Sequence, residues 1–190
     1  MTDGEKWLTM RPDVPISVEV AEGIGRVVIA FGHVENELLG TIAFLLGAYG
    51  SRVRATLANV GFAGRVDALV SLAWARWQED APMKGVNATA NRLRQVAALR
   101  NRYVHSLYWG TAYVEPPHTP VPDATLLGTQ RGTHASLQIL GYVTRQSLDE
   151  ATKQIDDVAL ELVTLHAELE GFSRAQGDFV DISPEWMRGR

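Results

Sequence analysis

The amino-acid sequence predicts a mainly α-helical protein, an up-and-down helical bundle with a small β-hairpin or meander inserted before its last long helix. Two observations carry this prediction. Apolar residues recur at helical spacings of three, four and seven through most of residues 17–174. Residues 110–146 break that pattern, because they are rich in Pro, Gly and Thr and hold short β-prone runs. The 190 residues are 46% hydrophobic and 21% charged, which suits one domain with a sizeable core.

The chain divides into an N-terminal arm, one bundle domain and a C-terminal tail. Residues 1–16 contain two prolines and little periodicity, residues 17–174 form the bundle with its insertion, and residues 175–190 follow as a tail. The N-terminal stretch lacks the long apolar core of a signal peptide. The longest apolar run, residues 38–50, is too short to span a bilayer. We therefore expect a cytoplasmic protein with no membrane partner.

The bulk composition excludes several kinds of chemistry. The sequence has no cysteine, so disulfides, thiolate metal sites and thiol nucleophiles are ruled out. A formal net charge of −4 argues against a surface that coats nucleic acid generally, although a local basic patch stays open. The sequence also lacks a phosphate-binding Gly-Lys-Ser/Thr loop, a His-Glu-x-x-His zinc helix and a Gly-x-Ser-x-Gly elbow. It therefore predicts no metal and no cofactor.

The first expected helix begins after Ser17, a residue type favoured at helix N-caps, and runs to about residue 48. Its inward face consists of two apolar rows at heptad spacing: Ile24, Phe31, Leu38 and Leu45, flanked by Val20, Val27, Val34 and Ile42. Gly32, Gly40 and Gly47 lie inside or at the end of this helix, where each lowers helical stability. We expect close packing against a neighbouring backbone to compensate for them.

The middle of the chain predicts three further helices. Residues 51–60 form a short helix, and residues 64–78 form a second one with an apolar inner side. The segment "EDAPMKG", residues 79–85, predicts a turn. After that turn a long helix is expected from about Asn87, a favoured N-cap residue, to about Tyr108.

The insertion and the last helix complete the bundle. Short β-prone runs at 111–114, 124–128 and 135–143 predict a small antiparallel hairpin or meander. The sequence "SLDE", residues 147–150, is a capping box that opens the last long helix. The buried stripe expected on that helix is Leu148, Ala151, Ile155, Val158, Leu162, Leu165, Leu169 and Phe172.

The sequence "RNRYVHS", residues 100–106, lies near the end of the fourth expected helix. Arg100 falls on its apolar stripe, seven residues after Leu93, and a buried guanidinium needs a carboxylate, carbonyl or phosphate partner. Asn101 and His105 are about 40° apart around the helix axis, so they share a face. Arg100 and His105 are about 140° apart, so only the long arginine side chain can bring them together. An arginine that extends out of the core and a surface histidine would give the same pattern.

The stretch "LRNRYVHSLYWG", residues 99–110, resembles the motif region of the HEPN superfamily of RNases. That motif is an Arg, a polar residue, three further residues and a His, near the end of a helix in an all-α domain. The upstream "FGHVENEL" and residues 62–72 are similar to the first helices of such proteins. The resemblance covers residues 20–108, and it implies a HEPN-like bundle to which the last long helix also conforms.

The resemblance implies a metal-independent endoribonuclease that cleaves RNA by attack of a ribose 2′-hydroxyl on the adjacent phosphate, without a cofactor. His105 would be the general acid or base, a role that suits imidazole near neutral pH. Arg100 would hold the phosphate and its developing charge with its planar fork. Asn101 would orient the histidine or bind phosphate.

Two further residues are expected to support this site. Glu35 shares the stripe of Phe31 on the first helix, so it could pair with Arg100, although a glutamate at the rim of the bundle fits equally well. Tyr108 follows His105 by three residues. Cytotoxic family members that are paired with a nucleotidyltransferase antitoxin carry a Tyr two residues after the His, where this chain has Leu107. Regulation by modification of that tyrosine is therefore not expected.

The expected partners are an RNA substrate and a second copy of the chain. One helix does not readily turn both Arg100 and His105 onto a single phosphate, whereas two helices across a two-fold axis would each supply one His. A toxin or phage-defence role, with an antitoxin or regulator, stays open. The main alternative is a non-catalytic HEPN-like dimeric module that binds nucleotide or RNA or serves as a scaffold. A purely structural bundle, in which Arg100 only pairs with Glu35, is a second alternative.

Overall fold

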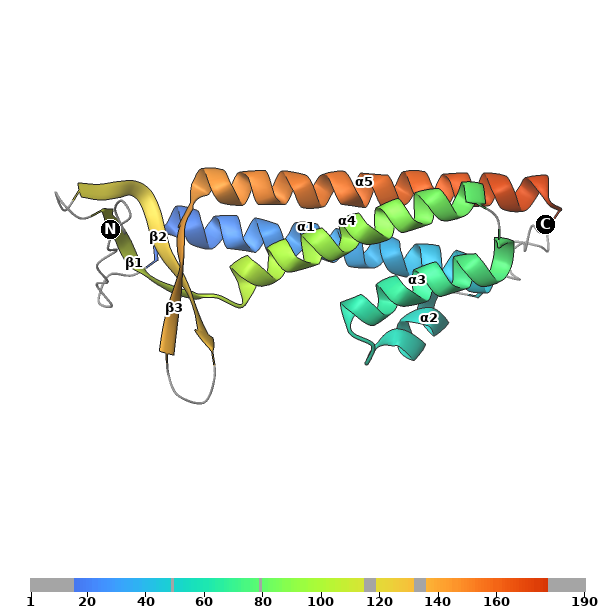
Figure 1. The fold of residues 1–190 in the computed structure, drawn as a ribbon, viewed down its shortest axis with the longest axis horizontal. Helices are drawn as coiled ribbons and strands as arrows, with labels where there is room; N and C mark the ends of the chain where they lie inside the picture. Colours follow the sequence, from blue (N-terminus) through green and yellow to red (C-terminus); the bar gives the residue numbers. More distant parts are fainter. Residues whose placement is uncertain (1–15, 49, 79, 115–118, 132–135, 178–190) are drawn as a thin grey trace, which may run out of the picture. The chain divides into compact units, whose positions relative to one another are not determined.

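The computed structural model describes residues 16–48, 50–78, 80–114, 119–131 and 136–177. This part of the chain is mainly helical, with a small antiparallel sheet before the last helix (Figure 1). The elements in chain order are α1 (Val18–Leu46), α2 (Gly50–Leu57), α3 (Phe62–Trp77), α4 (Asp80–Val104), β1 (Leu107–Val114), β2 (Thr119–Arg131), β3 (Ser136–Thr144) and α5 (Arg145–Ala175). The predicted helical bundle with a β insertion is therefore present.

The chain forms two compact units whose boundaries fall inside α1, α4 and α5. The first unit takes its described residues from 1–30 and 98–154, and so holds the sheet and the end of α4. The second unit takes its described residues from 31–97 and 155–190, and so holds α2, α3 and the longer part of α4. The resemblance motif at residues 100–105 belongs entirely to the first unit.

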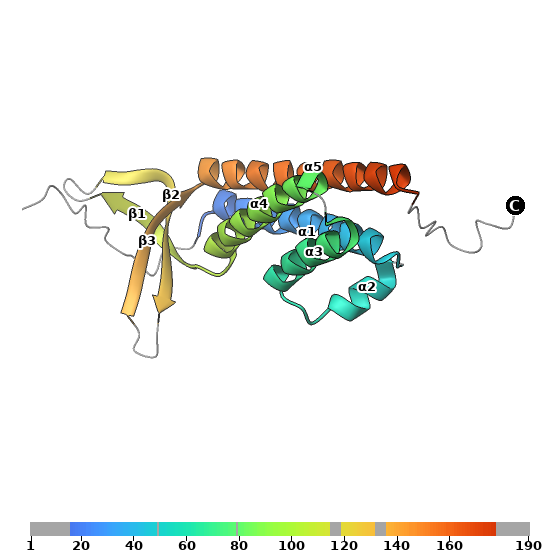
Figure 2. The same cartoon turned by 45° about the vertical axis from the view of Figure 1, so that its right-hand side comes forward.

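The sheet of the first unit is a three-stranded meander in the order β1-β2-β3, with both strand pairs antiparallel (Figure 2). β1 pairs with β2 from Leu107 opposite Gly128 to Val114 opposite Thr119, with register shifts after Trp109 and Thr111. The meander occupies the predicted insertion, although β1 begins three residues before residue 110. The strand begins early because the helix that precedes it ends early, at Val104.

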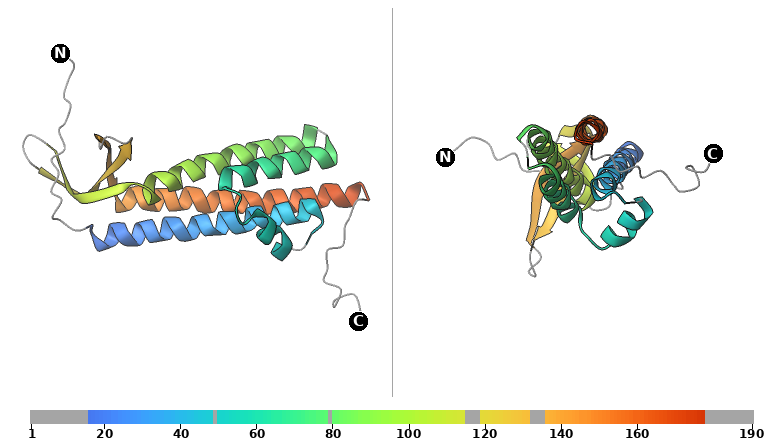
Figure 3. Two further views of the ribbon diagram at one scale, coloured as in Figure 1. Left: turned by 90° about the horizontal axis from the view of Figure 1, so that it is seen from below. Right: turned by 90° about the vertical axis from the view of Figure 1, so that its right-hand side faces the viewer.

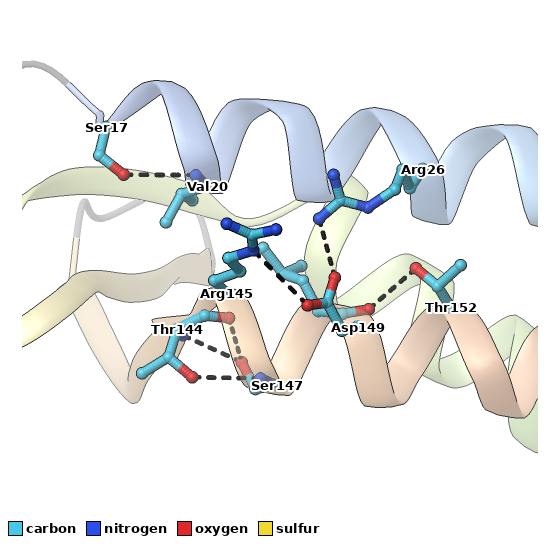
Figure 4. Close-up of polar contacts among 9 residues, drawn as sticks. Ser17, Val20, Arg26, Thr144, Arg145, Ser147, Asp149 and Thr152 are labelled. Atoms are coloured by element: carbon cyan, nitrogen blue, oxygen red, sulfur yellow. Dashed lines mark hydrogen bonds and ion pairs between the residues drawn. The ribbon is translucent and has the colours of Figure 1, made fainter.

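The last helix begins at Arg145, three residues earlier than predicted. The reason is that its cap is not the expected pair of Ser147 and Glu150 (Figure 4). Thr144 is the N-cap: its Oγ1 accepts a hydrogen bond from the Ser147 backbone N–H at 3.1 Å. The Ser147 hydroxyl accepts one from the Thr144 N–H at 3.0 Å in return. The two residues thus form a reciprocal capping box three positions upstream of the predicted one.

Side-chain packing joins α1 to α5 within the first unit. A Cβ added to Gly23 would lie 2.6 Å from Leu148 Cδ1, so this glycine allows the two helices to approach closely. Arg26 donates a hydrogen bond to Asp149 at 2.8 Å, and Arg145 approaches the other oxygen of that carboxylate at 3.7 Å (Figure 4). Besides Gly23, the buried residues described for this unit are Val20, Val27, Ala30, Tyr103, Thr125, Val143, Leu148 and Ala151.

The second unit is a helical core in which α3 and α4 run side by side and antiparallel (Figure 3). The Phe31 and Phe62 rings pack with centroids 4.8 Å apart. Its largest fully buried side chains are Leu38, Ile42, Leu69, Leu93, Ile155, Leu162 and Leu169. Across the chain, the apolar stripes predicted for the first and last helices are buried, except for Ile24 and Phe172, which are only half-buried.

Two predicted boundaries of α4 are wrong. The predicted turn at residues 79–85 is helical from Asp80 onward, because Pro82 falls in the first turn, where a missing N–H does not break a helical hydrogen bond. The chain reverses before it, where Gln78 adopts a left-handed conformation (φ 50°) and its N–H caps Trp74 O. At the other end, α4 stops at Val104, so Tyr108 lies in β1 and not on the helix.

The glycines of α1 do not all serve the predicted purpose. A Cβ added to Gly32 or Gly40 would meet nothing within 4 Å, so the expected close packing is wrong for both. Gly47 follows the end of α1 with φ 60°, a left-handed conformation that glycine adopts without strain, and its N–H donates to Phe44 O at 3.0 Å. It is therefore a helix terminator.

α1 is long and apolar enough, by length and composition alone, to cross a membrane, and no other helix among the described residues is. A single helix of this kind is weak support for a membrane span, because core helices pass the same test. Half of its most apolar window is buried inside the structure.

Candidate functional site

The candidate site lies in the first unit, where α4 ends and the chain turns into β1. Arg100 and Asn101 belong to the last turns of α4, Val104 is its final residue, and His105 follows immediately. The His105 backbone N–H still donates to Asn101 O at 3.1 Å, so the histidine is held as the residue that closes the helix. The Ser106 hydroxyl in turn hydrogen-bonds Arg102 O, which fixes the start of the connection to β1.

The structure brings the three predicted catalytic residues together. Arg100 Nη1 lies 3.0 Å from Asn101 Oδ1 and 2.6 Å from His105 Nε2. A guanidinium can only donate hydrogen bonds, so His105 Nε2 is the acceptor in this contact. The contact agrees with the prediction that only the long arginine side chain can bring Arg100 and His105 together. The arginine side chain spans the angular gap, and His105 lies beyond the last regular helical residue.

Burial differs sharply among these residues. The Arg100 side chain is half-buried and its Nε atom is shielded from solvent, whereas Asn101 and His105 are exposed. Arg100 therefore reaches from the packed side of α4 to a solvent-facing cluster. This position fits the predicted stripe, and it delivers the guanidinium fork to the surface rather than to the core. The result is an exposed imidazole with a positive charge against one of its nitrogens.

The two predicted supporting residues are placed differently. Glu35 lies in the second unit, where its carboxylate accepts a hydrogen bond from Arg65 Nη1 at 3.2 Å. Arg65 also donates from Nε to Val60 O at 2.9 Å, so this pair ties the α2–α3 connection to α1. Tyr108 lies on β1 opposite Leu127 of β2, and its side chain falls outside the described residues.

Arg102 is a candidate residue that the sequence reasoning missed. Residues 81–114 contain five basic residues and no Asp or Glu, although the whole chain carries a net charge of −4. Those basic residues are Lys84, Arg92, Arg94, Arg100 and Arg102. Arg92 and Arg94 are neutralised by Glu161 and Asp67. Arg102 is exposed and forms no ion pair with any residue that the structure describes. Arg102 precedes His105 by three residues, and this spacing could have indicated that the two side chains are neighbours.

A second histidine-centred cluster lies in the second unit. His166 on α5 contacts Thr41 Oγ1 through Nδ1 at 3.3 Å and Glu170 Oε1 through Nε2 at 3.4 Å. Its ring packs on Phe44 with centroids 5.2 Å apart, and the Thr41 hydroxyl donates to Glu37 O. Both ring nitrogens of His166 are thus engaged between α1 and α5. This cluster joins helices and presents no group to solvent comparable with His105.

Within the described residues, no group of three or more His, Asp or Glu side chains is arranged to hold a metal ion. No family model matches the sequence, and neither the curated proteins nor the solved structures contain a significant match. The assignment of a function therefore depends on the residues at the end of α4.

Proposed function

We propose that this chain is a metal-independent endoribonuclease of the HEPN type, acting on cytoplasmic RNA with His105 as general acid or base and Arg100 as the phosphate ligand. The observation that carries the proposal is the three-residue cluster at the end of α4. Arg100 Nη1 contacts both Asn101 Oδ1 and His105 Nε2, and the imidazole faces solvent. Arginine, amide and imidazole side chains in contact at an exposed point suit the binding of a phosphodiester.

The proposed reaction is a transesterification within the RNA chain. His105 removes the proton of a ribose 2′-hydroxyl, and the 2′ oxygen attacks the adjacent phosphorus. An O2′–P bond forms while the P–O5′ bond breaks, which leaves a 2′,3′-cyclic phosphate and a 5′-hydroxyl end. The departing 5′ oxygen takes up a proton from a general acid. Arg100 stabilises the charge that grows on the non-bridging oxygens, since a guanidinium can bind two of them at once.

In the free protein the lone pair of His105 Nε2 is occupied by the Arg100 guanidinium. A phosphate is the stronger acceptor for arginine, because two charge-assisted hydrogen bonds replace one bond to a neutral ring. Substrate binding would therefore draw Arg100 away from Nε2 and release the ring nitrogen that accepts the 2′-hydroxyl proton. Asn101, which also contacts Nη1, would hold the displaced fork in place.

The homodimer of this proposal rests on proton transfer rather than on helix geometry. Arg100 and His105 of one chain contact each other, so the proposal takes the need for a second copy from the reaction itself. The reaction still needs a base for the 2′ oxygen and an acid for the 5′ oxygen, and each motif supplies one His105. Two copies related by a two-fold axis would supply both. Light scattering of the purified chain at micromolar concentration should give twice the monomer mass, and a monomer would contradict this part.

The decisive experiment is incubation of the purified chain with structured and unstructured RNA in the presence of EDTA, beside His105→Ala. We expect the parent to produce 2′,3′-cyclic phosphate ends and the variant to produce none. His33→Ala, which removes an exposed histidine of α1, is the matched control and should cleave like the parent. Cleavage that EDTA abolishes, or that survives in His105→Ala, contradicts the proposal.

The competing function is a non-catalytic dimeric module that binds RNA or nucleotide. The short contact between Arg100 and His105 favours it, because each group already satisfies the other in the free chain. The same assay separates the two functions. A parent protein that binds RNA but leaves it intact, under all the conditions tested, identifies the binding module.

A further inference from the structure

We infer that Arg102 binds a second phosphate of the same RNA strand, so that the site engages single-stranded RNA across two consecutive phosphates. This inference rests on the proposed function, because it assigns the scissile phosphate to Arg100. It adds to that function the class of substrate, an extended single strand, and a residue that selects it.

The first argument is the position of Arg102 around the end of α4. Residues three apart on a helix are neighbours about 60° apart, and residues four apart are about 40° apart in the other direction. Although α4 ends at Val104, the His105 backbone N–H still makes the helical hydrogen bond to Asn101 O at 3.1 Å, so this spacing extends to His105 and places it between Asn101 on one side and Arg102 on the other. Arg100 Nη1 contacts Asn101, so the Arg100 guanidinium lies on the Asn101 side of the imidazole. Arg102 lies on the other side, so the imidazole has a cationic side chain on each side. A nucleotide chain that places its scissile bond over His105 would extend its next phosphate toward Arg102.

The second argument is the availability of the Arg102 guanidinium. The side chain is exposed, and no described carboxylate pairs with it. Its guanidinium carbon lies 5.8 Å from the centroid of the buried Tyr103 ring, so the charged end of the side chain lies against an aromatic ring that the fold holds in place. Six other described arginines contact carboxylates: Arg26, Arg65, Arg92, Arg94, Arg145 and Arg174. Arg102 therefore keeps its charge for an external anion.

A purely structural role for Arg102 makes a different prediction. Cations in the last turn of a helix stabilise the partial negative charge of the free carbonyl groups there. Such a role affects the stability of the fold and leaves the salt dependence of RNA binding unchanged. A phosphate contact displaces counterions, so its loss lowers the slope of log Kd against log salt by about 0.7 for a single strand.

The test measures binding of a fluorescent 2′-O-methylated single-stranded oligoribonucleotide, which lacks the attacking hydroxyl, to the full chain over a range of KCl concentrations. Arg102→Gln should lower the slope by about 0.7 and weaken binding. Arg102→Lys should keep most of the slope, because lysine still binds phosphate as a point charge. Arg94→Gln is the matched control on the same helix, and its slope should equal that of the parent because Arg94 is paired with Asp67.

A second ligand, uridine 3′-monophosphate, separates the two phosphate positions. It has one phosphate, so Arg102→Gln should bind it like the parent while binding the oligonucleotide more weakly. Equal losses for both ligands would overturn the assignment of a second phosphate. A parental salt slope in Arg102→Gln, with a lowered melting temperature, would make Arg102 structural and leave the proposed function standing.

The remaining outcomes keep the two proposals distinguishable. If the parent binds the oligonucleotide with the predicted Arg102 dependence but does not cleave unmodified RNA, catalysis is wrong and the second phosphate position is right. If the parent binds neither ligand, both proposals are wrong.

Discussion

The two histidine clusters of this chain differ in what surrounds the imidazole. His166 is held through both ring nitrogens, by the Thr41 hydroxyl and the Glu170 carboxylate, and its ring packs on Phe44. Among the residues that the structure describes, the His105 ring is held only through Nε2, by the Arg100 guanidinium, and it is exposed at the end of a helix. One cluster joins α1 to α5 inside the second unit. The other presents an imidazole and a guanidinium to solvent.

The difference shows how the hydrogen-bond partners of a histidine separate a structural role from a binding or catalytic one. Hydroxyl and carboxylate partners that come from the fold itself complete the hydrogen bonding of His166, which leaves nothing for a ligand. A guanidinium partner places a cationic group against His105, and the neighbouring Arg102 is a second exposed cation. An external phosphate can replace the Arg100–His105 contact, because arginine binds phosphate more strongly than it binds a neutral ring.

The largest expected effect comes from exchanging the two histidines for alanine in separate variants. His105→Ala should lower RNA cleavage by roughly 10²–10⁴-fold, because a positioned acid or base is lost, and should leave the melting temperature nearly unchanged. His166→Ala should leave the cleavage rate unchanged and lower the free energy of unfolding by about 1–2 kcal/mol, because Thr41 and Glu170 lose a partner. Cleavage rates and thermal melts on the same preparations measure both effects. The reverse pattern would contradict the comparison.

The next effect tests whether Arg100 acts through its fork or only through its charge. Lysine keeps the positive charge but loses the planar geometry with two donor positions. Arg100→Lys should fold normally yet lose most cleavage, with kcat lowered more than KM, because the fork acts mainly as charge develops on the phosphate. Steady-state kinetics and a thermal melt are the measurements. A variant that melts early but cleaves at nearly the parental rate would make Arg100 structural.

A third effect separates the stability of the first unit from its chemistry. Gly23→Ala places a Cβ 2.6 Å from Leu148 Cδ1, and such overpacking should cost about 1–3 kcal/mol. Gly25→Ala, two residues away, meets nothing within 4 Å and should stabilise α1 by about 0.5–1 kcal/mol. Chemical denaturation measures both changes. Below the melting transition each variant should cleave RNA at the parental rate, and a large loss of kcat in Gly23→Ala would show that the packing of α1 on α5 controls the site.

The sequence was a good guide to the helices and a poorer guide to their ends. Apart from Ile24 and Phe172, the apolar stripes of α1 and α5 are buried as predicted, because burial of one face follows directly from helical spacing. The ends depend on single residues that a pattern does not resolve. Pro82 favours a break in a helix, but a proline is tolerated in the first turn of a helix, where Pro82 lies in α4. Ser147 and Glu150 also match the capping-box motif, but Thr144 and Ser147 are the residues that cap α5.

The candidate site was predictable in its members but not in its arrangement. Helical spacing indicated that only the long side chain of Arg100 could reach His105, and the structure shows this contact, but the spacing did not show that α4 ends at Val104. Glu35 was a reasonable partner for any inward arginine, and the one that it contacts is Arg65. Arg102 was overlooked because an exposed arginine is unremarkable until the neighbouring charges are known.

The smallest expected effect is on stability in acid, and it tests the first unit without using either histidine. In the first turn of α1 a hydrogen bond to the backbone N–H of Glu19 lowers the pKa of its carboxyl below the ordinary 4.5, and the Ser17 hydroxyl lowers this pKa further. Because the folded pKa is the lower one, the charged carboxylate stabilises the fold above pH 4.5, and this contribution is lost as the pH falls through the folded pKa. The free energy of unfolding of Glu19→Gln should therefore decline less than that of the parent as the pH is lowered from 7 to below 4.5. Ser17→Ala should reduce the same difference, and urea denaturation at a series of pH values measures it. A parent and a Glu19→Gln variant that lose stability in parallel would show that the carboxylate contributes nothing to the start of α1.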